Sequence, residues 1–422
     1  MKVIVVAAIL LVTLSSAAAP RCHGTNNTVP LNEQDPVLIR SVPNGKLYLA
    51  GQGNDTFEVM HLWGTPYEMG YAQGQLRAEA FPKVWSHFTD YIESMINSKI
   101  HDLPQWLVDL FAQYGAPLLL QMSYANTKPF TPQRYLDEMQ GIADGAGIDV
   151  KIIQNINMFP ELTKAACTIV GANGVATPNG KIQHLRALDF SPHCPIKDYP
   201  QVTVYHGANG SATIANIGWA GLIGSLTGIS DTSIGIGEKV WLRHTKGISG
   251  VHGEPWMFIL RDVLMTANMD EALSTIVNAN RTCAIHVGIG DSTTNTFRGV
   301  QMAKERAEIF NWSSVSPSFS DKQHPVIEDV MYWDKHEQPT FSYCLSDLLQ
   351  MYHGQITAKD LALNIAPTSG TGNMHCVTFD YEAQLAFIAN ARKTNVTAGP
   401  LNAYERQFTQ LNLTKLWMEP AN

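Results

Sequence analysis

The sequence predicts a layered α+β fold, in which helices cover β-sheets. Two observations carry this prediction. Between about residues 66 and 143, apolar residues recur at three- and four-residue spacing, with Pro near the start of each segment, as in helices. After residue 167, short strand-like runs alternate with Gly, Asn and Pro turns. Strands in series, with helices grouped between them, indicate sheets covered by helices.

Ahead of residue 167 the chain is predicted to be mainly helical. Residues 20–42 are polar and rich in Pro and Asn, which indicates an extended segment. Strand-like runs follow at 47–49 and 57–62. Helical spacing then covers residues 66–97, 104–124 and 132–143.

After residue 167 we expect strands with a few helices between them. Thr357 has the position and chemistry of an N-cap for the last of these helices. Residues 375–381 and 383–390 are predicted to form a hairpin. The other predicted strands are 167–170, 181–190, 201–206, 212–217, 233–236, 284–289, 296–302 and 307–310, and the predicted helices are 254–266, 270–279, 341–352 and 357–365.

The composition is that of a large globular protein. Of 422 residues, 45% are hydrophobic and 16% charged, which is enough apolar material for a sizeable core. The sequence contains no internal repeat, low-complexity tract or clear linker, so we expect one globular domain. A formal net charge of −8 without a run of Lys or Arg argues against nucleic acid or an anionic membrane as a partner.

Residues 1–18 have the form of a secretory signal peptide. Lys2 precedes an apolar run from Val3 to Leu14, and small residues lead to an expected cleavage after Ala18. The run is too short to span a bilayer, and no other stretch reaches transmembrane length. We therefore expect a secreted or lysosomal protein. Asn-x-Ser/Thr sequons, which fit this pathway, stand at Asn26, Asn54, Asn209, Asn280, Asn311, Asn395 and Asn412.

Cys167, Arg186 and Asp189 form the candidate catalytic group. Cys167 opens an apolar run, and the Arg and Asp stand three residues apart on the next predicted strand. If the thiol cuts the peptide bond ahead of its own residue, Cys167 gains a free α-amino group. The ordinary pKa of that amine, about 7.7–8.0, lies near that of a thiol, about 8.5, so the amine can act as general base. The alternative is a disulfide cysteine beside a surface ion pair.

These residues resemble the isopenicillin N acyltransferase and acid ceramidase group of N-terminal nucleophile hydrolases, and most of all its secreted acid-ceramidase-like members. Cys-Thr at 167–168, followed by Arg-Ala-Leu-Asp-Phe at 186–190, is the most specific part of the likeness. Together the matching stretches span most of the chain. The others are 64–70, 73–74, 218–224, 226–229, 253–255, 260–262 and 371–375.

The resemblance implies a four-layer αββα sandwich, made as a precursor that cuts itself between Ala166 and Cys167. Residues 19–166 then form a mainly helical N-terminal chain, and residues 167–422 form a C-terminal chain that carries the nucleophile and the sheets. Cys167 is implied as nucleophile and base. Arg186 supports the thiolate and binds polar substrate atoms, and Asp189 orients the new ammonium group. No cofactor is implied, and scattered His residues without metal-ligand spacing indicate no metal.

The oxyanion hole departs from the family pattern. The family usually supplies an Asn, and the nearest counterpart in this sequence is Asp334. An ionised Asp cannot donate a hydrogen bond to an oxyanion. Either this placement is wrong, or Asp334 is protonated, or backbone amides are the donors. The alternative for Asp334 itself is an exposed turn residue beside Lys335.

The resemblance also implies a disulfide between the two chains. Cys22 is the one cysteine of the sequence that precedes the expected cut. We therefore expect a bond between Cys22 and Cys344, with Cys283 and Cys376 as competing partners. If Cys167 stays free, the remaining cysteines form at most two disulfides and leave one thiol.

The resemblance favours hydrolysis of the amide bond of an N-acylated small molecule, such as the lipid amide ceramide. Three alternatives stay open. An acyltransferase would pass the acyl group from Cys167 to an amine, and a phospholipase B-like hydrolase would use the same fold. A secreted glycoprotein would keep the fold without catalysis. The expected partners are the small-molecule substrate and the protein's own cleaved N-terminal chain.

Overall fold

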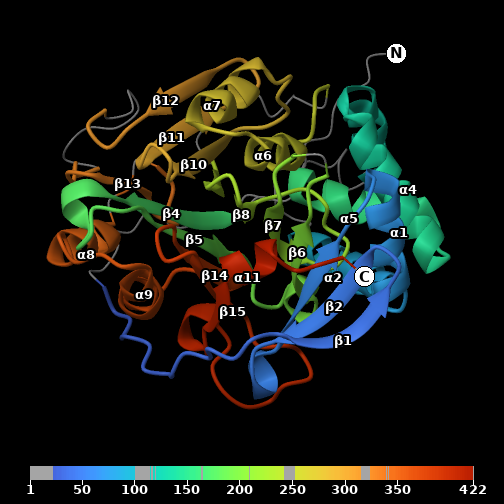
Figure 1. Ribbon diagram of the computed structural model, residues 1–422, viewed down its shortest axis with the longest axis horizontal. Coiled ribbons are helices and arrows are strands. Elements are labelled where there is room, and N and C mark those ends of the chain that lie inside the picture. The colour runs from blue at the N-terminus through green and yellow to red at the C-terminus, as the bar shows by residue number, and fades with distance from the viewer. Residues whose placement is uncertain are drawn as a thin grey trace.

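The computed structural model describes residues 22–99, 115, 117–118, 120–162, 165–208, 210–241, 252–314, 324–338, 340 and 342–421. In this part of the chain two β-sheets pack face to face, and helices cover both outer faces (Figure 1). The α+β fold is therefore a four-layer αββα sandwich, as predicted. The signal segment 1–18 and most of the predicted helix 104–124 lie outside the described residues.

The larger sheet contains ten described strands, taken from both sides of residue 167. β3 and β6 run parallel, and all other neighbours in this described sheet are antiparallel. The strands, in their order across the sheet, are β1 (Val37–Val42), β2 (Gly45–Ala50), β3 (Phe57–Leu62), β6 (Pro200–Tyr205), β7 (Ile214–Trp219), β8 (Thr227–Ser230), β9 (Ile234–Val240), β10 (Ile285–Asp291), β11 (Thr296–Met302) and β12 (Ala307–Phe310).

The smaller sheet contains six described strands, which are all antiparallel. The strands predicted near residues 167 and 181 are neighbours within it. The predicted hairpin over residues 375–390 is confirmed as β14 and β15. The order across the sheet is β13 (Val330–Trp333), β4 (Ala166–Ala172), β5 (Gln183–Asp189), β14 (His375–Asp380), β15 (Leu385–Asn390) and β16 (Thr409–Asn412).

Most helices form the two outer layers, whereas the buried residues of the short C-terminal helix over 413–417 belong to the cluster between the sheets. One group packs its apolar residues with the larger sheet, and α8, α9 and α10 pack theirs with the smaller sheet. Among the described residues, no helix is both long and apolar enough to cross a bilayer. The first group is α1 (Pro66–Arg77), α2 (Ala80–Lys99), α4 (Gln133–Ala146), α5 (Val150–Leu162), α6 (Trp256–Leu264) and α7 (Met269–Asn278). The remaining helices are α8 (Cys344–Met351), α9 (Ala358–Asp360), α10 (Ala366–Ser369) and α11 (Leu413–Trp417).

Local signals fix several helix starts. Thr65 and Glu68 form a capping box at the start of α1, where Pro66 takes the first helical position. Thr357 is confirmed as N-cap and forms a capping box with Asp360. The predicted helix 66–97 is divided into α1 and α2, because Pro82 has no N–H for the carbonyl one turn earlier.

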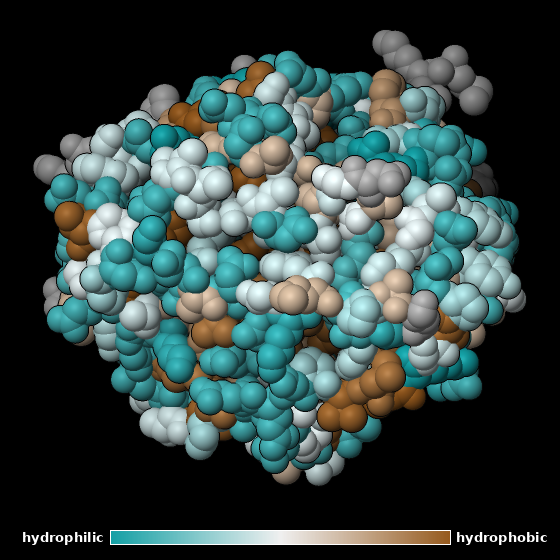
Figure 2. All heavy atoms as spheres, viewed as in Figure 1, coloured by the Kyte–Doolittle hydropathy of each residue, from teal (hydrophilic) through white to brown (hydrophobic). Residues whose placement is uncertain are grey.

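Several elements escaped sequence prediction, among them β8, β13, β16 and α11, and for three others the physical reason is clear. α5 is buried on most sides and contains Pro160, so it shows no clean amphipathic stripe. β9 was predicted only to residue 236, yet it continues to Val240 through a charged pair. β1 lies at the sheet edge, and its exposed apolar residues Val37, Leu38 and Ile39 lie where Figure 2 shows a hydrophobic patch.

A disulfide joins two segments that are far apart in the sequence. Cys22 and Cys344 are bonded, with a Cα–Cα distance of 4.9 Å across a sequence separation of 322 residues. This is the pair that the resemblance implies. Cys167, Cys194 and Cys376 are free cysteines. The bond ties the segment ahead of β1 to the first residue of α8.

Candidate active site

The pairing of β4 with β5 positions the candidate catalytic residues. In this antiparallel pair, Ile169 lies opposite Arg186, and Ala166 lies opposite Asp189. Residues two apart on a strand, and residues directly opposite across a pair, share one face of the sheet. Cys167 and Arg186 therefore point to the same face. Asp189 lies beside the peptide bond expected to be cut.

The Cys167 thiol is buried and in contact with charge. Its side chain is 0% exposed, so solvent and substrate do not reach it in the continuous chain. Arg186 Nη2 lies 3.4 Å from the sulfur, and the thiol lies 3.8 Å from Glu238 Oε1. Burial raises the pKa of the Cys167 thiol, and the Arg186 charge opposes that rise. The uncut chain thus holds a protonated, shielded thiol.

Arg186 is fixed by partners from two other strands. Its Nη2 donates to Glu238 Oε1 at 2.6 Å, and its Nη1 donates to His375 Nε2 at 2.7 Å. Since a guanidinium can only donate, His375 accepts through Nε2. Burial, followed by the Arg186 charge, lowers the pKa of His375, so this imidazole stays neutral. The guanidinium is held between a carboxylate and a neutral ring.

Asp189 is held by the segment that precedes β14. Gly372 N donates to Asp189 Oδ1 at 2.9 Å, and Thr371 Oγ1 bonds the other carboxylate oxygen. The Thr371 hydroxyl also lies 2.7 Å from that of Thr168, the residue after the nucleophile. Burial raises the pKa of Asp189, while the charge of Lys335 and these hydrogen bonds oppose the rise. The carboxylate is therefore oriented at the start of β4.

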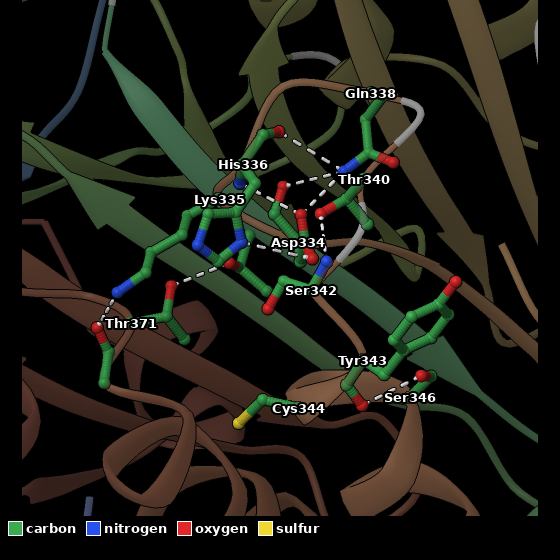
Figure 3. A network of polar contacts seen from close by, with 12 residues as sticks. Asp334, Lys335, His336, Gln338, Thr340, Ser342, Tyr343, Cys344, Ser346 and Thr371 are labelled. Carbon is green, nitrogen blue, oxygen red and sulfur yellow. Dashed lines mark hydrogen bonds and ion pairs between the residues drawn. The ribbon is translucent and has the colours of Figure 1, made fainter. Parts of the chain in front are cut away.

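Asp334 lies in a turn after β13, but it is buried and not exposed. Figure 3 shows its carboxylate directed toward His336 and Gln338. His336 N donates to Asp334 Oδ1 at 2.9 Å, and Gln338 Nε2 donates to the same oxygen at 2.7 Å. The carboxylate acts as an acceptor in both contacts. The oxyanion role of Asp334 stays a prediction.

Sequence reasoning missed Glu238 and gave no role to Thr371 or His375. The last two stand in a matching stretch, 371–375, without a spacing that links them to Cys167. Glu238 and Lys239 had a usable signal, because a charged pair in a glycine- and isoleucine-rich strand is costly to bury without partners. No group of three or more His, Cys, Asp or Glu in the described ranges is arranged to hold a metal.

The sequons differ in exposure. Asn26, Asn54, Asn280 and Asn395 are exposed, and Asn209 lies outside the described residues. Two others are half-buried. Asn311 accepts the Ser313 hydroxyl at 2.8 Å, and Asn412 is the N-cap of α11. Glycosylation at each of the seven positions stays a prediction.

Solved structures with partial likeness include amide hydrolases. The Caenorhabditis elegans N-acylethanolamine-hydrolyzing acid amidase ortholog has a TM-score of 0.41 and 14% identity, covering 51% of this chain and 93% of its own. A mutant of the conjugated bile acid hydrolase from Clostridium perfringens has a TM-score of 0.36 and 12% identity, covering 60% of this chain and 95% of its own. We base the fold on the sheets and helices described above.

Sequence relatives match over nearly the whole chain. Protein dcd1A of Dictyostelium discoideum is 38% identical over 98% of this chain and 98% of its own length. Protein dcd1B of the same organism is 36% identical over 92% of this chain and 81% of its own length. No protein-family model matches. The chain belongs to the family of the dcd1A and dcd1B proteins.

Proposed function

We propose that this protein is a cysteine N-terminal nucleophile amidohydrolase that cuts itself ahead of Cys167 and then cleaves the amide of an N-acylated small molecule. The main supporting observation is the hairpin of β4 and β5. It sets Arg186 Nη2 3.4 Å from the Cys167 sulfur and places Asp189 opposite Ala166. A thiol, a fixed cation and a carboxylate beside the future amine are the groups that this chemistry requires.

The first reaction is the cut of the chain by its own thiol. The Cys167 sulfur adds to the carbonyl carbon of Ala166, and the C–N bond to Cys167 breaks as its nitrogen takes a proton. Water then hydrolyses the thioester, which leaves a carboxylate on Ala166 and a free thiol and amine on Cys167. Asp189 is the last residue of β5 and lies opposite Ala166, so its carboxylate can hold this amine as an ammonium group.

The second reaction uses the same atoms on an external amide. The α-amino group takes the thiol proton, and the sulfur adds to the substrate carbonyl. The amine part of the substrate leaves with a proton from the ammonium group, and water releases the acid. Since an α-amino group has an ordinary pKa of about 7.7–8.0, it can exchange this proton with the thiol.

A lipid amide such as ceramide fits the surroundings of the thiol. Cys167 belongs to an apolar cluster that includes Leu188 and Phe159, with Phe190 packed against it. The Phe159 and Phe190 rings meet edge to face at 6.2 Å. Apolar walls suit an acyl chain. Because Cys167 is fully buried in the continuous chain, entry of such a substrate requires displacement of the segment ahead of it.

The deciding experiment is intact mass and N-terminal sequencing of the deglycosylated, reduced protein, with wild type compared to Cys167→Ala and Cys167→Ser. We expect a chain that begins at Cys167 in wild type and none in Cys167→Ala. Cys194→Ala is the matched control, since Cys194 is also fully buried but lies outside the site. Uncut wild type after acidification would remove the proposal and leave the non-catalytic glycoprotein.

Substrate choice is tested next, on the cut protein. Release of free fatty acid is measured from N-acylsphingosine, from an N-acyl amino acid and from a lysophospholipid. Hydrolysis of the two amides, but not of the ester, supports the amidase. Preference for the lysophospholipid would favour a phospholipase B-like hydrolase, and acyl transfer to added amines would favour an acyltransferase.

The compartment is proposed from the sequence. The signal segment and the exposed sequons support passage through the secretory pathway, with delivery to the lysosome or the medium. Removal of N-glycans should lower the apparent mass of the cellular protein. An unchanged mass and a cytosolic location would contradict this part of the proposal.

A further inference from the structure

Lys239 is a buried lysine that directly follows Glu238, a residue in contact with the Cys167 thiol. The residue is 1% exposed and stands on β9, next to Glu238. A buried ammonium is costly unless it is paired, so its position needs a reason. The mechanism proposed above uses Cys167, Arg186 and Asp189 and gives Lys239 no task.

Strand alternation turns Lys239 toward the space between the sheets. A Cβ atom built on Gly237, two residues earlier, would lie 2.7 Å from Arg186 Cγ, so this face of β9 meets the face of β5 that carries Arg186. Lys239 stands on the same face of β9 as Gly237. It therefore enters the site from the opposite sheet to Cys167.

The ammonium contacts the turn that follows β13. Its Nζ donates to the Lys335 carbonyl at 3.4 Å, at the turn that contains Asp334. Burial lowers the pKa of Lys239, and the charges of Asp334, Cys167 and Asp189 oppose this change, in that order. An ammonium carries three N–H donors, and the Lys335 contact is the hydrogen bond it makes among the described residues.

We propose that Lys239 donates a hydrogen bond to the oxyanion formed when the Cys167 sulfur adds to an acyl carbonyl, with Asp334 as its counter-ion. As the S–C bond forms, the electron pair of the C=O double bond moves to oxygen. The pair returns when the C–N bond breaks and the amine leaves with a proton. Lys239 supplies the fixed positive charge during this interval. This inference rests on the proposed function.

The two cations then have different roles. Arg186 contacts the sulfur, so it acts on the thiolate. Lys239 acts on the oxygen. Asp334, which accepts from His336 and Gln338, acts on the ammonium through its charge and does not donate to the oxyanion. The Asn that the family usually supplies is then replaced by a lysine with a carboxylate in the neighbouring turn.

The test compares a reaction that forms an oxyanion with one that does not. Acylation of cut protein by p-nitrophenyl butyrate is followed as a burst of nitrophenol, and alkylation by iodoacetamide is followed by mass over a range of pH. Lys239→Met should slow acylation about 100-fold or more and leave the limiting alkylation rate unchanged. Lys239→Arg, which keeps the charge and donors, should recover part of the acylation rate.

Lys197→Met is the matched control. Lys197 is also a buried lysine whose Nζ donates to a backbone carbonyl, that of Pro192 at 2.8 Å, but it lies in the turn before β6. The Lys197→Met protein should be acylated and alkylated at the wild-type rates. Equal loss of both reactions in Lys239→Met overturns the inference, because Lys239 would then act on the thiolate alone. Unchanged acylation overturns it as well.

Self-cleavage gives a second readout, since it passes through the same addition to a carbonyl. A Lys239→Met chain that melts like wild type but is cut much more slowly than wild type and Lys239→Arg supports the role, and the cut fraction that accumulates is the protein used for acylation and alkylation. If Lys239→Met does not fold, Lys239→Gln, which keeps a donor without the charge, serves in both comparisons. A wild type that is neither cut nor acylated overturns the proposed function itself.

Discussion

Arg186 shows at the scale of single residues how far a site depends on contacts that sequence spacing does not reveal. Its distance of three residues from Asp189 is visible in the sequence, and its pairing opposite Ile169 follows from two adjacent strands. Its partner Glu238 stands 52 residues away. No local pattern links the two. The grouping of Cys167, Arg186 and Asp189 could thus be predicted, whereas the contacts that hold these side chains in place could not.

Glu161 carries a prediction about pH. This residue, at the end of α5, accepts Trp256 N at 2.8 Å and the Thr282 hydroxyl at 3.1 Å. Burial raises the pKa of its carboxyl to about 7, against the effect of these hydrogen bonds. The folded protein therefore holds this proton more tightly than the unfolded chain does. Stability from this group is complete below the unfolded pKa and is lost as pH rises through about 7.

We expect Glu161→Gln to remove this loss. The amide keeps the acceptor oxygen and cannot ionise, so the variant should match wild type at low pH. Near pH 8 it should be more stable by roughly 3 kcal/mol. Melting temperatures at both pH values measure the difference, with Glu93→Gln on the exposed face of α2 as control. A gain of equal size at both pH values would exclude the titration of Glu161 as its cause.

At the scale of elements, β9 explains both a success and a failure of prediction. The run 233–236 was predicted as a strand from its alternating apolar residues and glycines. Glu238 and Lys239 ended the predicted strand, because charges are rare at fully buried positions. Arg186 on β5 binds Glu238, and the turn after β13 accepts a hydrogen bond from Lys239. Tertiary contacts therefore extend the strand beyond its local signal.

Gly237→Ala tests the close approach of the two sheets at the site. The new methyl group would lie 2.7 Å from Arg186 Cγ, and Arg186 cannot yield because Glu238 and His375 hold it. We expect a loss of about 1–3 kcal/mol in stability and slower formation of the chain that begins at Cys167. Thermal melting and intact mass over time measure both.

Gly290→Ala is the control for this prediction. Its methyl group would lie 2.5 Å from the Tyr381 hydroxyl, in the same layer but not against Arg186. It should lower the melting temperature without slowing the cut. If both variants slow the cut equally, the effect follows from overall stability and not from Arg186.

At the scale of the whole molecule, the layer order could be predicted, but the membership of the larger sheet could not. The change from helical to strand-like texture near residue 167 predicted the α+β class. Nothing local indicated that β3 pairs with β6, because helices α1, α2, α4 and α5 and the β4–β5 hairpin stand between them in the sequence. Pairing over such separations is decided by the packing of the complete chain.

The Cys22–Cys344 bond carries the last prediction. In a cut protein it should hold the two chains together on a non-reducing gel, and reduction should give two bands. Cys22→Ser should give two bands without reduction and, as an uncut chain, lose about 2–4 kcal/mol of stability. Cys283→Ser, which leaves the Cys22–Cys344 bond intact, should behave like wild type. Co-migration of the two chains in Cys22→Ser would show that another bond links them.

The parallel pairing of β3 with β6 has a consequence for how long the folded protein lasts. In a continuous chain this pairing forms within one folding molecule. If the bond ahead of Cys167 is cut, the first three strands of the larger sheet belong to a separate polypeptide, which is then tied to the rest through the Cys22–Cys344 bond and no longer through the peptide chain. A cut molecule that unfolds must refold without the continuous chain in which it first folded. We expect its lifetime to be set by the rate of unfolding and not by an equilibrium.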